Sequence, residues 1–166
     1  LFSGSTNERA KRIVADHIRA SVFLITDGVL PSNKDQGYIL RRLLRRMMVQ
    51  LRTFDVDVIS PVTRVIEMYK DLYNLDEKKI LPVIQEEVKK FKKTLSEGLK
   101  EIKKLDKITG KEAFVLYETY GFPLEVLEEM HEVENREDFF VELKKHQELS
   151  KTASAGMFKG GLADHD

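Results

Sequence analysis

Between Gly37 and Val49 the chain reads GYILRRLLRRMMV, in which pairs of apolar residues alternate with pairs of arginines. At about 100° per residue, a helix places Arg41, Arg42, Arg45 and Arg46 within an arc of roughly 140°. The opposite side of such a helix holds mostly leucine and methionine, whereas a strand would carry arginines on both of its faces. The segment therefore predicts an amphipathic helix with one strongly basic face.

Apolar residues recur at three- and four-residue steps along most of the chain, which is typical of helices. A capping box between Ser5 and Glu8 predicts the start of a first helix that ends at Asp27-Gly28. The longest helix is expected from Asp76, with an apolar seam from Ile84 to Leu105 in which Gly98 permits close approach of another helix. Further helices are predicted from Ser60-Pro61 to about Tyr73, from Thr109 to Gly121, from Leu124 to His131, and after Asn135. We expect an all-α fold of about seven helices.

Composition agrees with a single helical domain followed by a short tail. The chain has 166 residues, of which 42% are hydrophobic and 34% are charged. We assign residues 1–152 to the helical domain. Residues 153–166, which read ASAGMFKGGLADHD, are expected to form a flexible linker. Since cysteine, a secretory leader and an apolar run of roughly 20 residues are all lacking, we expect a cytoplasmic protein that does not bind a membrane.

The chain is neutral overall, with 28 basic and 28 acidic side chains, but the charges are segregated. Residues 34–52 carry six basic side chains and one acidic, whereas residues 118–142 carry nine acidic and one basic. The basic helix face can be solvated, can pair with the acidic block, or can contact phosphate groups. The PSN turn before it places the amide of Asn33 beside a helix N-terminus and a row of guanidinium groups, which favours nucleic acid.

Motifs for catalysis or metal binding are not visible. The chain lacks a glycine-rich phosphate loop, and its histidines, at 17, 131, 146 and 165, lack the spacing of metal ligands. His17 lies on the apolar stripe of the first helix, where a packing role is favoured. We therefore predict no catalytic and no metal-binding residues. The alternative to a nucleic-acid contact is a non-catalytic protein-interaction module whose Ile84–Leu105 seam binds a partner helix.

Four stretches, in order, resemble alanyl-tRNA synthetases. They are RIVADHIRASVFLITDGVLPSNKDQGYILRRLLRRMM (12–48), FKKTLSEGL (91–99), ITGKEAFVLYETYGFPLE (108–125) and MFKGGLADH (157–165). In that family this region lies between the class II catalytic domain and the editing domain. The resemblance implies that residues 1–152 recognise the tRNA(Ala) acceptor stem and that residues 153–166 form the hinge toward the editing domain.

The resemblance also implies partners and cofactors. The partners are the acceptor stem of tRNA(Ala) and the catalytic and editing domains of the same protein. ATP with magnesium belongs to the catalytic domain and zinc to the editing domain, so no cofactor is expected on the residues of this chain.

The family recognises a G·U wobble pair in the acceptor stem, whose free guanine amino group faces the shallow minor groove. The resemblance assigns the base contacts to the amide of Asn33 and the carboxylate of Glu125, where many family members have aspartate. Gln36 stands where the family usually has arginine. The resemblance and the charge pattern together assign contacts with the RNA backbone to five basic residues, Lys34, Arg41, Arg42, Arg45 and Arg46.

Overall fold

The computed structural model describes residues 7–52 and 54–158. Within them it contains seven helices and two short strands, and most of the chain is helical, so the predicted all-α class is confirmed. The elements in order are α1 (Glu8–Thr26), α2 (Asp35–Arg52), α3 (Ile59–Tyr69), α4 (Glu77–Ile102), β1 (Ile108–Thr109), α5 (Gly110–Tyr120), α6 (Leu124–Met130), β2 (Val133–Glu134) and α7 (Arg136–Phe158).

The strands were not predicted. They pair in parallel, with Ile108 opposite Val133 and Thr109 opposite Glu134, and two residues are too few to show an alternating pattern.

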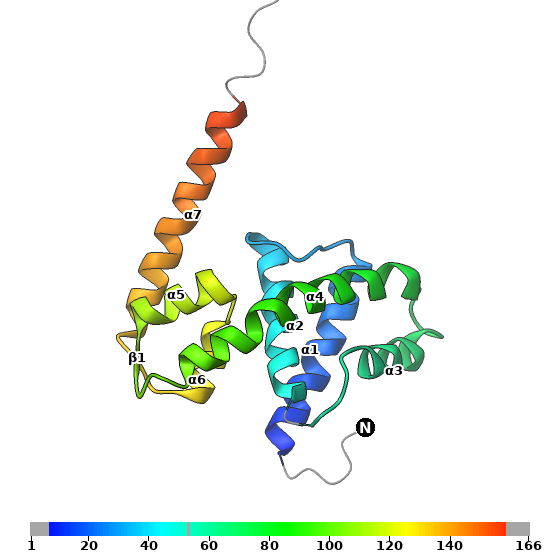
Figure 1. Ribbon diagram of the computed structural model, residues 1–166. Helices are drawn as coiled ribbons and strands as arrows, with labels where there is room; N and C mark the ends of the chain where they lie inside the picture. The colour runs from blue at the N-terminus through cyan, green and yellow to red at the C-terminus, as the bar shows by residue number, and fades with distance from the viewer. Residues whose placement is uncertain (1–6, 53, 159–166) are drawn as a thin grey trace, which may run out of the picture.

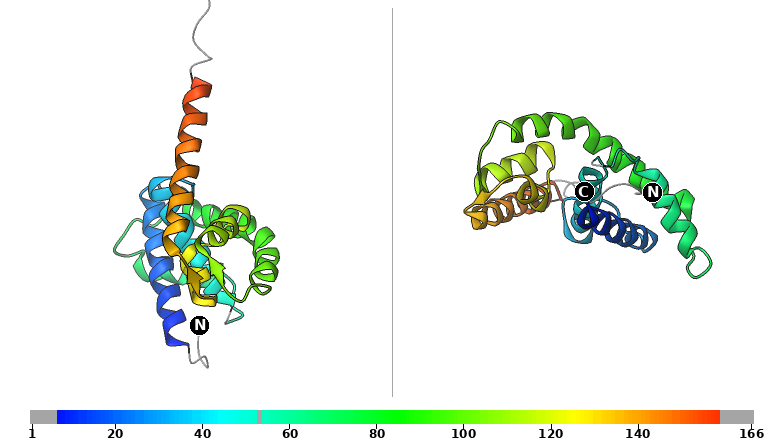
Figure 2. Two further views of the ribbon diagram at one scale, coloured as in Figure 1. Left: turned by 90° about the vertical axis from the view of Figure 1, so that its left-hand side faces the viewer. Right: turned by 90° about the horizontal axis from the view of Figure 1, so that it is seen from below.

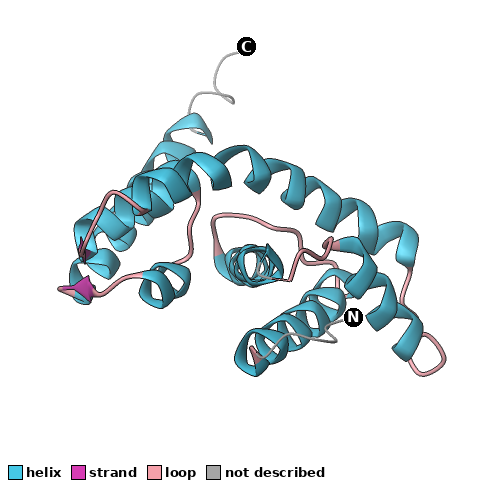
Figure 3. Cartoon of the chain, turned by 60° about the horizontal axis from the view of Figure 1, so that its bottom comes forward, coloured by secondary structure: helices cyan, strands magenta, loops and turns pink. Residues whose placement is uncertain are grey.

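Helix α4 bridges two groups of helices (Figure 1). On one side α1 packs against α2 and α3, and on the other α5 packs against α7, while α4 contacts α1, α2, α3 and α5. Seen from below, α4 curves along one side of the molecule (Figure 2, right), and the view of Figure 3 shows it passing over α1 and α2. Beyond its contact with α5, helix α7 extends away from the other helices (Figure 1). No described helix is long and apolar enough to cross a membrane.

Several helix ends lie where their sequence predicted. Asp76 caps α4, because its side chain accepts a hydrogen bond from the backbone N–H of Lys78 at 3.0 Å. Thr109 and Glu112 form the predicted capping box of α5. Gly121 ends α5 in the left-handed region with φ of 75°, which glycine adopts without strain.

Two other helix starts differ from prediction. The N-cap of α1 is Asn7, whose side chain accepts from the N–H of Ala10 at 3.0 Å; the predicted cap, Ser5, lies outside the described residues. Helix α3 already includes Ser60, because Asp57 Oδ1 accepts from the N–H groups of both Ile59 and Ser60 at 2.8 Å. The prediction that Ser60 is the cap was therefore wrong.

The C-terminal ends of two helices also differ from prediction. Helix α3 ends at Tyr69, four residues before the predicted end. Helix α7 continues to Phe158, so residues 153–158, expected in the linker, are helical. Residues 159–166 lie outside the described part of the chain, and a domain boundary at 152 stays a prediction.

The apolar seam of α4 is covered by the chain itself. Ile84, Phe91, Leu95 and Ile102 are all buried, and a Cβ on Gly98 would lie 2.4 Å from Phe122 Cε2. Gly98 thus permits the close approach that its position predicted. Since this face packs against other helices of the same chain, it is not free for a partner helix, and the interaction-module alternative loses its proposed surface.

Candidate nucleic-acid interface

Asn33 is held in a tight turn just before α2. The N–H of Ser32 donates to the Gly37 carbonyl at 3.0 Å, and the Ser32 hydroxyl donates to the Lys34 carbonyl at 2.9 Å. A Cβ on Gly37 would lie 2.2 Å from Ser32 Oγ, so glycine is required for this close packing. The turn leaves the side chain of Asn33 exposed at the start of the basic helix.

The predicted basic helix is confirmed, and its first arginine holds Asn33. Arg41 Nη1 donates to Asn33 Oδ1, and its Nη2 lies 3.4 Å from the Pro31 carbonyl oxygen. The Nε of the same guanidinium lies 3.5 Å from Glu87 Oε1 on α4. Arg41 therefore ties the PSN turn both to α2 and to the neighbouring helix.

The next arginine holds Glu125. Arg42 Nη1 lies 3.2 Å from Glu125 Oε1 in the first turn of α6. The second carboxylate oxygen, Oε2, is buried without a hydrogen-bond partner among the described residues. Arg41 and Arg42 are consecutive residues of α2, so Asn33 and Glu125 each contact the N-terminal half of the same helix.

Arg45 is embedded between helices. Its Nε donates to Glu87 Oε1 at 2.7 Å and its Nη1 donates to the Gly121 carbonyl at 2.9 Å. Its guanidinium carbon lies 5.0 Å from the centre of the Phe91 ring, within the range of a cation–π contact. The side chain is only 15% exposed, and these contacts give it a structural role.

Arg46 binds the acidic block. Its Nη2 donates to Glu129 Oε1, and Gln50 Nε2 donates to the other oxygen of the same carboxylate. Together with the Arg42–Glu125 pair, this contact confirms the predicted alternative in which the basic helix face pairs with the acidic residues of 118–142. Arg42, at 40% exposed, is the most accessible of the four arginines, and Lys34 is also exposed. Contact of any of these five basic residues with phosphate stays a prediction.

Three titratable side chains near this face, His17, Tyr38 and Tyr117, are neutral at pH 7 because their pKa values are shifted by burial. Burial, reinforced by the charge of Arg46, lowers the pKa of His17 from its ordinary value. This agrees with the packing role expected for His17. Burial also raises the pKa of Tyr38, and raises that of Tyr117 to about 12. The two tyrosine rings meet edge to face, with their centres 6.2 Å apart, and both keep a hydroxyl proton to donate.

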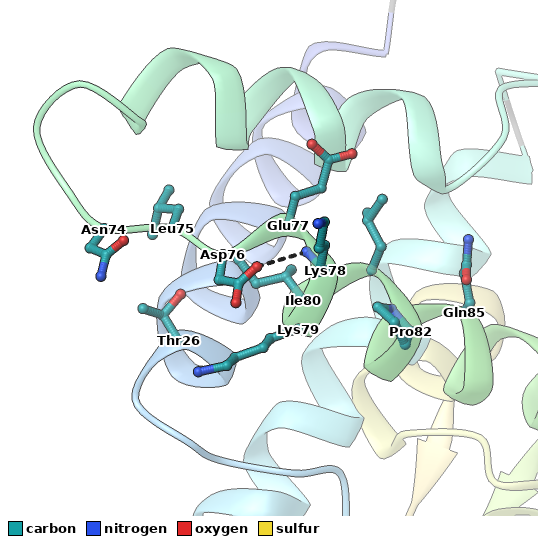
Figure 4. Close-up of a pocket in the computed structure, with 11 residues that line it drawn as sticks. Thr26, Asn74, Leu75, Asp76, Glu77, Lys78, Lys79, Ile80, Pro82 and Gln85 are labelled. Carbon is teal, nitrogen blue, oxygen red and sulfur yellow. Dashed lines mark hydrogen bonds between the residues drawn. The ribbon is translucent and has the colours of Figure 1, made fainter.

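Two surface cavities have polar residues in their linings. A cavity of about 270 Å³ adjoins the basic face and includes Asn33, Arg41 and Tyr117 in its lining. A larger one, of about 1320 Å³, lies at the N-terminus of α4 (Figure 4). There the carboxylate of Asp76 is used to cap the helix (Figure 4). Among the described residues, no group of three or more histidine, aspartate or glutamate side chains could hold a metal ion.

Sequence reasoning missed Glu87, which is 2% exposed and contacts two of the arginines. A signal was available, because Glu87 stands three residues after Ile84 and four before Phe91, on the face of the apolar seam. A carboxylate at such a position needs a cationic partner.

Comparison with known proteins agrees with the resemblance in the sequence. The family model described as tRNA synthetases class II (A) matches residues 3–161. The chain is 42% identical to an alanine–tRNA ligase of Borrelia hermsii over 95% of its length. It is 40% identical to that of Bacillus pumilus and 36% to that of Bacillus subtilis, each over 90% of its length. The chain spans only 30%, 20% and 19% of these three proteins, respectively.

Proposed function

The chain belongs to the class II (A) family of tRNA synthetases, and from this premise we propose that it is the part of an alanine–tRNA ligase that recognises the acceptor stem of tRNA(Ala). The whole protein would attach alanine to tRNA(Ala) with ATP in the cytoplasm. ATP with magnesium would bind to a catalytic domain and zinc to an editing domain. This chain would contribute by holding the terminal adenosine where the activated alanine can react with it.

The proposed base contact is a G·U wobble pair. In this pair the guanine amino group is left unpaired in the minor groove, which is wide and shallow in RNA. The carboxylate of Glu125 would accept a hydrogen bond from that amino group, and the amide of Asn33 can both donate to and accept from a base edge. In a G·C pair one N–H of this amino group is bound to cytosine and the guanine is displaced relative to its wobble position, so the contact would be weaker.

The basic residues would position the RNA backbone. Lys34 and Arg42 are the most accessible of the five proposed phosphate contacts, Lys34, Arg41, Arg42, Arg45 and Arg46. Such contacts fix the register of the RNA without reading its sequence. The carboxylate of Glu125 would have to be shared between Arg42 and the guanine amino group. Its Oε2 has no hydrogen-bond partner among the described residues and could accept that bond after a movement of the side chain.

The observation that carries the proposal is that consecutive arginines of α2 hold Asn33 and Glu125, which are 92 positions apart in the chain. Asn33 is exposed, whereas Glu125 is only 28% exposed and its Oε2 is buried, so the carboxylate would have to turn outward to contact RNA.

The test is binding of RNA hairpins that copy the acceptor stem with G·U or with G·C at the same position, measured by fluorescence anisotropy over a salt series. We expect affinity to fall with salt and the G·U hairpin to bind more tightly. Asn33→Ala and Glu125→Gln should each reduce the preference by roughly tenfold, in the range of a lost base contact. The matched control is Glu128→Gln, because Glu128 lies on the same helix and pairs with Arg136 of α7. Absent binding, or equal affinity for both hairpins, would refute the proposal.

A further inference from the structure

We infer that Glu87 is a positioning residue that sets the relative placement of Asn33 and Glu125 through Arg41 and Arg45. Its consequence for RNA recognition rests on the proposed function. The positioning itself is argued from contacts within the chain.

Glu87 is the shared anchor of two arginines. Among the described residues, Glu87 is the only charged side chain that is buried, at 2% exposed. Its Oε1 accepts from Arg45 Nε at 2.7 Å and lies 3.5 Å from Arg41 Nε. Since α4 and α2 belong to different parts of the sequence, this carboxylate fixes how the two helices face each other.

Each arginine passes that constraint to one of the two proposed base-reading residues. Arg41 reaches the Asn33 side chain and the Pro31 carbonyl, which holds the PSN turn. Arg45 donates to the carbonyl of Gly121, two residues before Pro123, which is the N-cap of α6; Glu125 lies in the first turn of that helix. The Glu87 carboxylate is therefore linked to the segments that carry both proposed base contacts, Asn33 and Glu125.

The charge of Glu87 matters more than its shape. Glutamine has nearly the same volume, but it cannot neutralise two guanidinium groups that are themselves largely covered. Removing one partner from a buried ion pair leaves uncompensated charge, and the arginines would turn toward solvent or toward other carboxylates. The PSN turn and the start of α6 would then no longer be held in fixed positions relative to each other.

The experiment compares Glu87→Gln with Glu86→Gln in the 166-residue chain. Glu86 is the adjacent residue of α4, but it is exposed and pairs with Lys90 at 2.6 Å, so its substitution removes the same charge without touching the arginines. The first measurement needs no RNA: NMR signals of the Asn33 side-chain amide and the Gly121 backbone amide. We expect both to shift in Glu87→Gln and neither to shift in Glu86→Gln.

The second measurement is the preference for G·U over G·C hairpins. Glu87→Gln should reduce it about tenfold, since small displacements of positioning groups have effects of this size or larger. The dependence of affinity on salt should not become weaker, because no proposed phosphate contact is removed and arginines released from Glu87 stay available to phosphate groups. A general loss of structure would instead weaken binding to both hairpins equally, and that result would overturn the inference.

The two proposals can fail separately. If the unaltered chain does not distinguish the hairpins, the proposed function fails, and the NMR signals still decide whether Glu87 positions both segments. Unmoved Asn33 and Gly121 signals in Glu87→Gln, or an unchanged G·U preference, would overturn the positioning role. If Glu87→Gln does not fold, Glu87→Asp replaces it. The shorter carboxylate keeps the charge and should leave an intermediate G·U preference, and a full preference would count against the inference.

Discussion

At the scale of single residues, the arginines of α2 differ in what surrounds them although they share one helix face. Arg45 is enclosed by Glu87, the Gly121 carbonyl and the Phe91 ring, whereas Arg42 is 40% exposed. A guanidinium with several fixed partners serves the fold, because moving it toward RNA would leave a buried carboxylate unpaired. In the proposed contact with RNA, the arginines best placed to exchange partners are those paired near the surface.

The first prediction concerns Gly121. A Cβ there would lie 1.6 Å from Arg45 Nη1, in addition to the cost of a φ of 75°. Gly28 has a φ of 89° but nothing within 4 Å of the added Cβ, so Gly28→Ala is a matched control for backbone strain alone. We expect Gly28→Ala to lower the free energy of unfolding by about 1–2 kcal/mol and Gly121→Ala by at least about 2 kcal/mol more, through the steric clash with Arg45. Urea unfolding measures both, and equal losses would show that the Arg45 contact contributes nothing.

At the scale of elements, α4 joins the two groups of helices by packing different stretches of one face. Ile80 and Ile84 near its start are buried, and α4 contacts α1, α2 and α3, while Gly98 lies against Tyr120 and Phe122. Glu87 falls between these stretches, at the level of the basic helix. A single continuous helix thereby sets the distance between the PSN turn and the start of α6.

The second prediction tests that packing at Gly98. Helix propensity alone would make Gly98→Ala stabilising by about 1 kcal/mol. The added methyl would, however, lie 2.4 Å from Phe122 Cε2 and 2.9 Å from Tyr120 Cβ, and overpacking of this kind costs about 1–3 kcal/mol. We expect a net loss in the free energy of unfolding, measured by urea unfolding. Ser96→Ala, at an exposed position of the same helix, should be neutral or slightly stabilising, and a stabilising Gly98→Ala would contradict the close approach.

At the scale of the whole molecule, α6 is attached to α2 by a row of ion pairs. Arg42 pairs with Glu125 and Arg46 with Glu129, and Glu129 also accepts from Gln50. These contacts connect the basic segment of the chain with its acidic segment, which explains why a neutral chain has segregated charges. They also place the carboxylate of Glu125 within the same row.

The third prediction concerns Glu129, whose side chain is 16% exposed. Glu129→Gln removes the charge that Arg46 pairs with, and a hydrogen bond to a charged group contributes about 1.5–3 kcal/mol. We expect the backbone amides of α6 to exchange with solvent roughly tenfold faster or more, while those of α3 keep their protection. Glu128→Gln, which alters a contact with α7, should leave the attachment of α6 to α2 unchanged. Equal protection of α6 in Glu129→Gln and the unaltered chain would refute this attachment.

Local features were predictable wherever they depend on neighbours in the sequence. The cap formed by Thr109 and Glu112 and the end of α5 at Gly121 each involve residues at most a few positions apart. The start of α3 was predicted wrongly: the N-cap is Val58, and the side chain of Asp57, not that of Ser60, accepts from the first N–H groups of the helix. Asp57 and Ser60 are both good caps, and the sequence offers no reason to prefer one of them.

By itself, the sequence determined the helical periodicity, the basic face of α2 and membership of the synthetase family, because these properties depend on residue types at fixed spacings. Only the tertiary structure decided which carboxylate each arginine binds. Arg45 and Glu87 are 42 positions apart, and Arg46 and Glu129 are 83 apart. The strength of such a pair depends on burial and on the packing of whole helices, and neither is recorded in the spacing of the residues.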